Sequence, residues 1–446
     1  MRLRILFGLA GLSSIAFAQA PPVQLKTPDI KLPGPLSFPS ADPGGIGSAP
    51  LTVSEAVAIA LRKQPGVNIA RANLLQQQGR TQEVASALNP QFSATSGLSN
   101  QTGLRNGGLL GGNFTSSTAS VSVQQLLFDF QRTRDEVRQQ SAIERSTLST
   151  LKRTFQTVEL QVKLAFYDLV QSRASVATGQ ANMVNRQRQL DQAQARASSG
   201  LGAPVDVVQA KTNLADAAIS LSFSRNQEIS SRISLALILG IDSRTPLNLA
   251  DSGEPVVPDE GDLEKLVGIA LSKRLDIVAA REQVTASHIG IGVARKGNVP
   301  SVAATAGVNS VGQGSPFTGQ AGVVGINLGW TFGDGGLTRG RVKEAVAGEQ
   351  IARESVIAVS NQAVADVSQA FTDLQSALQR VELATSGTAN AKELVRSSEV
   401  RYAGGIGLFI DITNAQNSLF AAETNLTQAQ QDVERARARL RAAIGV

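Results

Sequence analysis

The fold of this chain is decided by the stretch RYAGGIGLFIDI at residues 401–412, of which a second copy, RASSGLGAPVDV, occupies residues 196–207. Gly200 corresponds to Gly405 at a separation of 205 residues, and each copy carries an aspartate near its end. A long polar-rich stretch with helical periodicity precedes each copy, and another follows it. Glycine permits the left-handed backbone that ends a helix, and aspartate is a favoured residue at the start of the next one. The two copies therefore predict two antiparallel helical hairpins.

The correspondence extends over most of the chain. Pro90 matches Pro300 at a separation of 210 residues, and Phe166 matches Phe371 at a separation of 205. An internal repeat of this length is a specific architectural signal. It predicts a tandem duplication of helix, two strands, long helix, glycine turn and helix. The predicted boundaries are 51–240 for the first repeat, 241–262 for a connector and 263–446 for the second repeat.

The N-terminus has the features of an export signal. Arg2 and Arg4 precede an apolar run, and Ala16-Phe17-Ala18 is a small-x-small cleavage site, so residues 1–18 are interpreted as a secretory signal peptide. The alternative, an anchor helix, has too few apolar residues to span a membrane comfortably. Residues 19–50 hold eight of the 16 prolines and are predicted to form an extended leader. No cysteine follows the cleavage site, which excludes lipid attachment there.

Composition narrows the class of protein. Only 4% of the 446 residues are aromatic and the cysteine count is 0, which favours long, thin helical packing without disulfides over thick globular cores. Removal of the signal peptide lowers the formal net charge of +6 by two. The remaining basic residues are scattered among acidic ones, and no basic patch is interleaved with aromatics, which argues against nucleic-acid binding.

Three helices are predicted in the first repeat, at residues 52–87, 131–197 and 205–239. Thr52 or Ser54 is the expected cap of the first. The second has an apolar stripe at spacings of four and three residues, and at ~1.5 Å per residue it would be on the order of 100 Å long. The two shorter helices together match the length of the long one. Stacked end to end, they would pack beside it and form a uniform helical wall.

Alternating stretches between the helices predict four strands, beginning near residues 91, 116, 302 and 324. A glycine-rich loop separates the two strands of each pair. One face of each strand is apolar, and the other carries Ser, Thr, Gly, Asn and Gln. Strands of this length and pattern are typical of a membrane barrel with a water-filled lumen. The alternative is a soluble sheet whose apolar face covers a core. Four strands cannot enclose a channel, and open edges cannot lie in lipid, so the barrel interpretation requires several protomers to share one barrel.

With the signal peptide, the tandem repeat, the strand pairs that end at Leu127-Phe128-Asp129 and Phe332-Gly333-Asp334, and the two glycine turns, the mature chain resembles the TolC-type outer-membrane efflux proteins. The resemblance implies a mainly α-helical fold with membrane β-strands. In that family three protomers contribute four strands each to a shared 12-stranded outer-membrane barrel, and long helical hairpins form a periplasmic tunnel. The implied partners are a periplasmic adaptor (membrane fusion) protein and an inner-membrane transporter of the RND, ABC or MFS type.

The second turn resembles the gate of that family. The resemblance places Tyr402, Gly405, Asp411 and Asn414 at gate positions. The best-known member has a second gate aspartate where this chain has Asn414, so half of the expected carboxylates are missing and cation binding at a closed tip should be weaker.

A second departure is Gly407, which stands where that member has an arginine. Arg401 is a candidate to supply the missing positive charge near Asp206. The gate candidates are therefore Tyr402, Asp411, Asn414, Asp206 and Arg401. The alternative role for Asp206 and Asp411 is plain capping of the helices that follow.

Apolar residues are concentrated at both turns, which is unusual for exposed loops and suggests a docking surface for a partner. The alternative is packing between neighbouring tips in a closed state. The candidate docking residues are Gly200, Leu201, Gly202, Val205, Gly405, Ile406, Gly407, Leu408 and Phe409.

An enzyme is disfavoured, because the chain has a single histidine (His288), no cysteine and no nucleophile or metal-ligand motif. No cofactor is expected. Two functions remain: a passive channel of the outer membrane that is gated at its periplasmic tips, and a coiled-coil spacer of the envelope without a pore. The four alternating stretches favour the channel. The sequence does not separate efflux of small molecules or metals from type I secretion.

Overall fold

A computed structural model of the chain describes residues 50–102, 113–250, 253, 261–313 and 319–446. These residues belong to one structural unit, Ala41–Val446. The predicted signal peptide and all of the predicted leader except Pro50 lie outside the described residues, as do parts of the two glycine-rich loops and of the connector.

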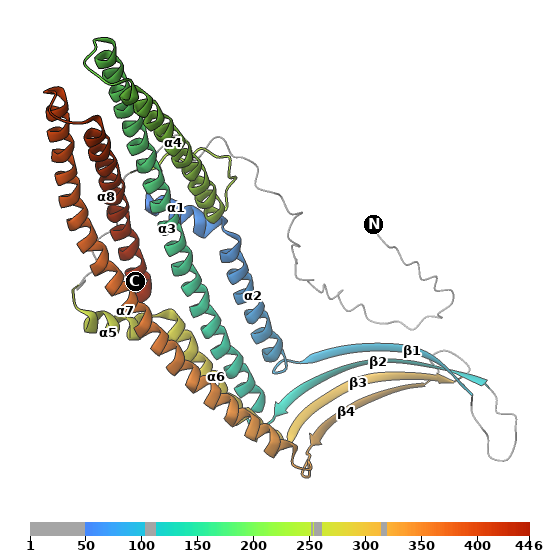
Figure 1. Cartoon of the computed structure of the whole chain (residues 1–446). Coiled ribbons are helices and arrows are strands. Elements are labelled where there is room, and N and C mark those ends of the chain that lie inside the picture. Colours follow the sequence, from blue (N-terminus) through green and yellow to red (C-terminus); the bar gives the residue numbers. More distant parts are fainter. Residues whose placement is uncertain (1–49, 103–112, 251–252, 254–260, 314–318) are drawn as a thin grey trace. The chain divides into compact units, whose positions relative to one another are not determined.

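The described elements follow the same order in both halves of the chain (Figure 1). The first half contains α1 (Val53–Lys63), α2 (Pro65–Ser86), β1 (Gln91–Thr102), β2 (Asn113–Phe128), α3 (Arg132–Ser198) and α4 (Pro204–Leu239). The second half contains α5 (Leu263–Lys273), α6 (Leu275–Arg295), β3 (Ser301–Gln313), β4 (Gly319–Gly329), α7 (Leu337–Ala403) and α8 (Phe409–Ile444).

The helix predicted at residues 52–87 is in fact two helices. Thr52 caps α1, because its Oγ1 accepts from the Glu55 backbone N–H across 3.3 Å and its own N–H donates to Glu55 Oε2 across 2.9 Å. Gln64 then adopts an extended backbone (ψ 127°) and α2 begins at Pro65. Proline lacks the N–H that would continue α1 and disfavours a helical residue before it. The second half has the same break at Arg274 without a proline.

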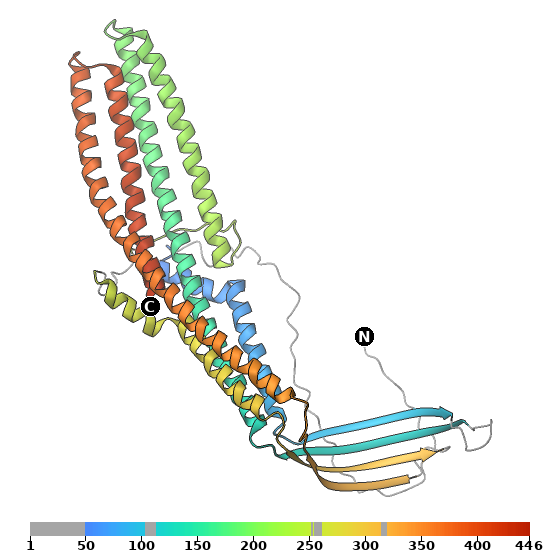
Figure 2. The same cartoon turned by 60° about the horizontal axis from the view of Figure 1, so that its bottom comes forward.

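The four strands form one antiparallel sheet in the order β1-β2-β3-β4, and Figures 1 and 2 show it at one end of the long helices. Phe92 lies opposite Val123, Val123 opposite Ala306, and Ala306 opposite Val324. The predicted alternation is therefore in register across the sheet. The first three strands are longer than predicted, at 12, 16 and 13 residues.

Helices α3 and α7 have 67 residues each, which corresponds to about 100 Å. Figure 2 shows both running without interruption from the sheet to the glycine turns. Helix α3 packs against α2 and α4, and α7 packs against α6 and α8. The end of α4 at Gly240 meets the α1–α2 junction at Lys63, as the end-to-end stacking predicted. Among the described residues, no helix has both the length and the apolar character that a membrane span requires.

Small apolar clusters recur where the shorter helices meet the long ones. One cluster includes Phe166 and Leu169 of α3 with Leu235 and Leu239 of α4. Its counterpart includes Leu374 of α7 and Leu440 of α8. Beside the second cluster, the guanidinium of Arg274 is 3% exposed and donates to Asp366 Oδ2 across 2.9 Å, to Asp276 Oδ2 across 2.7 Å and to the Ala443 carbonyl across 3.2 Å. This network fixes the end of α8 to α6 and α7.

Candidate functional site

The two glycine turns have the same backbone geometry. Gly200 and Gly405 have φ angles of +75° and +77°. The Leu201 N–H donates to the Arg196 carbonyl across 2.9 Å, and the Ile406 N–H donates to the Arg401 carbonyl across 3.1 Å. These bonds close the helix ends in the Schellman arrangement, which favours glycine because of its positive φ. The chain therefore reverses in the same way at the tip of each hairpin.

The second glycine of each turn is required by close packing of the backbone. A Cβ added at Gly202 would lie 3.0 Å from the Ala197 nitrogen, and one added at Gly407 would lie 3.0 Å from the Tyr402 nitrogen. The absence of a side chain at Gly407 is therefore explained by this close approach of the backbone. Any side chain there would push the turn away from the end of α7.

A small apolar core joins the α3–α4 hairpin to the α7–α8 hairpin at their tips. The rings of Tyr402 and Phe409 meet edge to face with their centroids 5.9 Å apart, and their residues are 8% and 6% exposed. Phe409 was expected among the exposed docking residues, but it is buried because its ring packs on Tyr402. The buried members of this tip core are Leu190, Ala193, Ala210, Tyr402, Phe409 and Ile412.

The cation beside Tyr402 is Arg196. Its guanidinium lies 4.6 Å from the centre of the tyrosine ring, and its Nη1 donates to the Tyr402 carbonyl across 3.2 Å. Burial is the main cause that raises the pKa of Tyr402 above its ordinary value; the Asp206 carboxylate adds to this and Arg196 opposes it. Arg401, the residue expected to supply the positive charge, is exposed. The sequence offered no sign of Arg196, because the contact joins positions 206 residues apart that are not equivalent in the repeat.

The remaining gate candidates lie around this core. The Asp411 carboxylate accepts from the Leu408 N–H across 3.2 Å and so occupies a helix-capping contact. Asp411 and Asn414 are exposed on the first turns of α8, and Asp206 is half-buried on the first turn of α4. A polar layer below them also joins the hairpins: Asn213 donates to Thr413 Oγ1 across 3.3 Å, and Arg186 donates to Asn417 Oδ1 across 2.5 Å.

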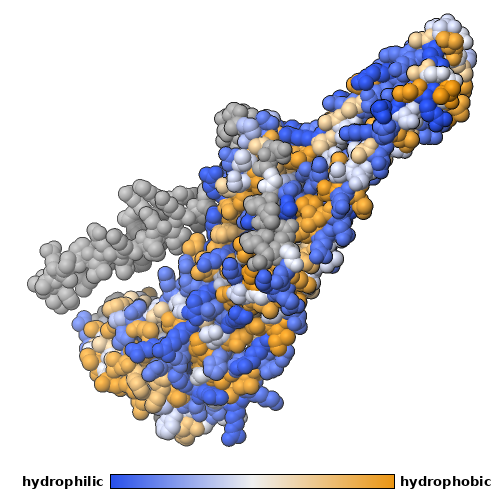
Figure 3. Space-filling model, turned by 90° about the vertical axis from the view of Figure 1, so that its left-hand side faces the viewer, coloured by the Kyte–Doolittle hydropathy of each residue, from blue (hydrophilic) through white to orange (hydrophobic). Residues whose placement is uncertain are grey.

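Outside the tip core, the apolar residues of the turns face solvent in the single chain. Leu201 and Val205 of the first turn, and Ile406 and Leu408 of the second, are all exposed. Figure 3 shows hydrophobic residues at this end of the hairpins, at its upper right. The two turns thus present one apolar patch each, without a covering segment among the described residues.

The sheet has one apolar and one polar face. The row Phe92, Val123, Ala306 and Val324 lies on one face. On the other, Ser93 and Ser122 share a hydrogen bond of 2.8 Å, Thr95 and Ser120 one of 2.7 Å, and Asn327 donates to Thr305 Oγ1 across 3.0 Å. Both faces are largely exposed in the single chain, so the apolar face does not cover a core of this unit.

The most extensive contacts between the two halves of the chain are those of β2 with β3, of α3 with α6, and of α3 with α8. Hydrogen bonds reinforce the helix contacts. Ser146 donates to the Ala279 carbonyl across 2.9 Å, Arg145 pairs with Glu282 across 2.9 Å, and Arg435 of α8 pairs with Asp168 of α3 across 2.7 Å. Within the described chain, α7 makes no contact of comparable extent with α2 or α4.

The comparisons with known proteins agree with this architecture. The family model described as outer membrane efflux protein matches residues 56–241 and 266–446. The chain is 24% identical over 391 residues to the outer membrane efflux protein BepC of Brucella suis, covering 86% of this chain and 82% of BepC. It is 25% identical over 370 residues to the outer membrane protein TolC of Escherichia coli, covering 78% and 73% of the two chains.

The fold is similar to that of the Campylobacter jejuni CmeC outer membrane channel, with a TM-score of 0.76 at 14% identity over 94% of each chain. The match of an efflux family to both halves of the chain decides against the alternative of a coiled-coil spacer. The chain belongs to the outer membrane efflux protein family and is a non-enzymatic efflux channel of the outer membrane whose helical part extends into the periplasm.

Proposed function

We propose that three copies of this chain form a closed ring that encloses one continuous duct, with a shared barrel in the outer membrane and a helical tunnel in the periplasm. The observation that carries the proposal is the set of contacts between the two halves of one chain. Because the chain is a repeat, each of these contacts has an equivalent in which the roles of the two halves are exchanged. The two surfaces that would form this equivalent contact do not pair within a single chain. A head-to-tail contact of this kind generates a ring when its rotation closes.

The sheet gives the first of these surfaces. Because β2 pairs with β3 where the halves meet, the repeat predicts that β4 of one copy pairs with β1 of the next. Among the strands that the structure describes, β1 and β4 are the edges. Such edges cannot remain open in lipid, since each unpaired backbone group there costs several kcal/mol. Pairing between copies removes both edges.

The size of the ring follows from the strand count. Two copies would supply eight strands, and a barrel of about eight strands is just wide enough to be filled by its own side chains. Three copies supply twelve and leave a lumen. The apolar row with Phe92 and Val324 would then face lipid, and the hydroxyl row with Thr95 and Ser120 would face water, in the pattern of membrane barrels.

The helices supply the second set of surfaces. Helix α3 packs on α6 and α8 of the other half of its own chain. Its equivalent, α7, would pack in the same way on α2 and α4 of the next copy. Six hairpins arranged in this way would continue the barrel as a tunnel about 100 Å long, given the 67 residues of α3 and α7.

The gate is proposed at the tips. The tip core around Tyr402 and Phe409, with Arg196 above the tyrosine ring, holds the two hairpins of one copy together. Separation of the α7–α8 hairpin from the α3–α4 hairpin would widen the mouth of the duct. Asp206, Arg401, Asp411 and Asn414 lie at or near the same end and are proposed to line that mouth; for Asp411, a capping contact accompanies this role.

The exposed apolar residues of the turns are proposed to dock a periplasmic adaptor protein, which would connect the duct to an inner-membrane transporter. Leu201, Val205, Ile406 and Leu408 carry this surface, while the glycines at 200, 202, 405 and 407 shape it. Relatives include a protein named for alkaline protease secretion and one named for pyoverdine export. We therefore propose exported solutes or proteins as cargo, selected by the inner-membrane partner.

The experiment that tests this function measures both the assembly and the pore. The mature protein is purified in detergent, its protein mass is determined by light scattering, and it is reconstituted into planar bilayers. A mass of three chains together with discrete conductance steps supports the proposal. A water-soluble oligomer that gives no conductance would overturn it.

A further inference from the structure

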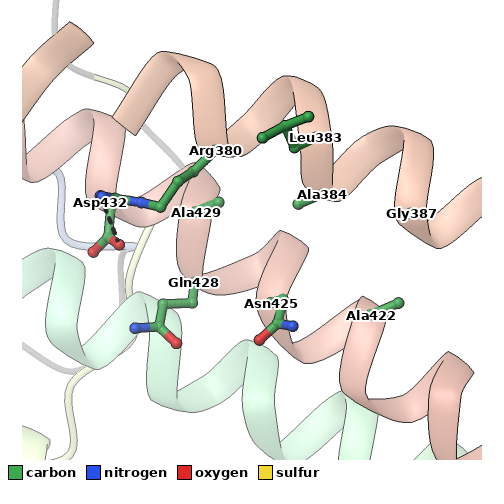
Figure 4. A pocket seen from close by; sticks show the side chains of 9 residues that line it. All are labelled: Arg380, Leu383, Ala384, Gly387, Ala422, Asn425, Gln428, Ala429 and Asp432. Atoms are coloured by element: carbon green, nitrogen blue, oxygen red, sulfur yellow. Dashed lines mark hydrogen bonds and ion pairs between the residues drawn. The ribbon is translucent and has the colours of Figure 1, made fainter. Parts of the chain in front are cut away.

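A groove lies between α7 and α8, about midway along α8 (Figure 4). Its volume is about 680 Å³, and small residues shape it, among them Ala384 and Gly387 of α7 and Ala422 of α8. Leu383 on its rim is 72% exposed. A Cβ added at Gly387 would have no atom within 4 Å other than those of the adjoining backbone of its own helix. The α7–α8 groove is therefore open. Leu383 is the uncovered apolar part of its rim, and the Arg380–Asp432 ion pair, Asn425 and Gln428 form its polar part.

Helix α4 of the other hairpin carries two exposed apolar side chains one turn apart. Phe223 is 70% exposed and Ile219 is 56% exposed. Residues four apart lie on one face of a helix. This face of α4 therefore offers an aromatic and an aliphatic side chain that the described residues do not cover.

The contact between α3 and α8 inside one chain shows how these two surfaces would meet. Arg435 of α8 lies opposite Asp168 and Gln171 of α3, at 2.7 Å and 2.6 Å. The two helices are antiparallel, so a step along α3 toward the tips matches a step back along α8. Seven residues, or two turns, from the Gln171–Arg435 contact, Thr178 comes opposite Gln428. One further turn brings Asn182 opposite Thr424.

Because the two halves of the chain are equivalent, the register of α3 against α8 predicts the register of α7 against α4 of the next copy. At the separation of 205 residues, Leu383 and Gly387 of α7 correspond to Thr178 and Asn182 of α3. Phe223 and Ile219 of α4 correspond to Gln428 and Thr424 of α8 in the same way. We propose that the α7–α8 groove receives Phe223 and Ile219 from α4 of the next copy, with Phe223 beside Leu383 and Ile219 beside Gly387. This inference rests on the ring of copies proposed above.

The residue types at the two contacts, α3 with α8 inside one chain and α7 with α4 between copies, support this assignment. Inside the chain, the register places Thr178 opposite Gln428, both polar, and the two halves are already joined by covalent bonds. Between copies, the equivalent residues are Leu383 and Phe223. Separate copies lose translational and rotational freedom when they associate, and burial of apolar surface is the main term that compensates for this loss. The apolar residues therefore lie at the contact between copies, where burial of apolar surface is needed to favour association.

A crosslinking experiment tests the register directly, since the native chain contains no cysteine. The double variant Phe223→Cys/Leu383→Cys is purified as the mature protein in detergent and treated with a mild oxidant or a short bismaleimide. A disulfide needs Cα atoms within about 7 Å. The expected product is a covalent species of three chains on a denaturing gel, which the disulfide form loses on reduction.

The matched control is Phe223→Cys/Leu394→Cys. Leu394 is also exposed on α7 but lies 11 residues from Leu383, or about 16 Å along the helix. The control pair and both single variants are expected to give no three-chain species. Crosslinking of the control pair, or of neither pair, would overturn the proposed contact.

Light scattering on the same samples before oxidation separates the two proposals. A mass of three chains with no Phe223–Leu383 crosslink overturns the groove contact and leaves the ring intact. A mass of one chain for both the native protein and the variants overturns the ring together with the contact. A mass of three chains for the native protein and one for Phe223→Cys/Leu383→Cys supports the contact, because the substitutions then remove the association.

Discussion

The guanidinium of Arg196, at the end of the first long helix, lies 4.6 Å from the ring centre of Tyr402, at the end of the second. The same arginine donates to the Tyr402 carbonyl across 3.2 Å. These contacts join hairpins from the two halves of the chain at the place where the duct would have to widen. Tip opening must break them.

Replacement of Arg196 by alanine is therefore expected to loosen the tips. The change removes a cation–π contact and a hydrogen bond, each worth about 1 kcal/mol. We expect amide hydrogen exchange in the turn at residues 403–408 to accelerate by about fivefold to thirtyfold. Arg188→Ala is the control, since Arg188 is an exposed arginine of the same helix. Equal exchange in both variants would show that Arg196 does not hold the tips.

The second prediction concerns the positive φ of the turn. Gly405→Ala places a Cβ in the left-handed region at a cost of about 1–2 kcal/mol. This cost destabilises the closed turn relative to its open state. The rate of amide hydrogen exchange at residues 403–408 is therefore expected to rise about tenfold. Gly348→Ala is the matched control: Gly348 lies within α7 with no atom within 4 Å of an added Cβ. An alanine there should leave the turn unchanged and strengthen the helix.

The third prediction distinguishes the two faces of the sheet. Val121 and Ser120 are neighbours in β2 and point to opposite faces. Val121→Lys puts a charge on the proposed lipid face, which costs about 2–4 kcal/mol near the middle of a bilayer. We expect it to reduce the yield of membrane-inserted protein severely. Ser120→Lys is expected to insert normally and to shift the ion selectivity of the pore toward anions, because it adds a positive charge to the lumen. The reverse pattern would mean that the faces are assigned the wrong way round.

The fourth prediction concerns the ionic network below the hairpins. Arg274 is buried beside Asp276 and Asp366, and its removal would leave both carboxylates without it. Both carboxylates are partly exposed, at 28% and 35%, so loss of their hydrogen-bonded partner is expected to cost about 1–3 kcal/mol. Arg274→Ala should lower the temperature at which helical circular dichroism is lost. Arg244→Ala should change that temperature little, because the Arg244 side chain is 80% exposed in its pair with Asp242.

The effect of Arg274→Ala should depend on pH. Burial disfavours the charged form of Asp276, but the hydrogen bonds and charge of Arg274 outweigh it and hold the pKa of Asp276 below its ordinary value. A carboxylate with a lowered pKa contributes stability above its unfolded pKa, and the contribution is lost as the pH falls through the folded pKa. The difference between Arg274→Ala and the native protein should therefore be largest near neutral pH and shrink in acid. A difference that is constant with pH would contradict this account.

Much of the fold could be predicted from local patterns. The alternation in β1 and β4 and the glycines at 200, 202, 405 and 407 specify backbone geometry by themselves, because a strand face or a positive φ depends on residues close in sequence. The break before Pro65 departs from the single helix predicted at residues 52–87, because the apolar periodicity continues across the proline that signals it. The break at Arg274 carries no local signal; its extended backbone accompanies contacts with Asp366 and Ala443, which are remote in sequence.

The candidate site was less predictable, because it depends on contacts between the two hairpins. The apolar sequence of the turns places Phe409 among the candidate docking residues, with packing between tips as the alternative. Phe409 is buried because the tips of the two hairpins share one core. For the same reason, Arg196 and not Arg401 lies beside Tyr402. A repeat relates equivalent positions, whereas a contact between the two halves joins positions that are not equivalent.

The most direct test of the central claim is the single-channel conductance of the mature protein and of Tyr402→Ala in planar bilayers. Tyr402→Ala removes the ring that joins the tip core to Arg196, so a gate at the tips predicts a conductance, or an open probability, several times that of the native channel. Ile410→Ala, at an exposed position of the same hairpin, should behave like the native channel. Channels that are identical in all three proteins would contradict a gate at this core, and the absence of channels from all three would contradict the duct itself.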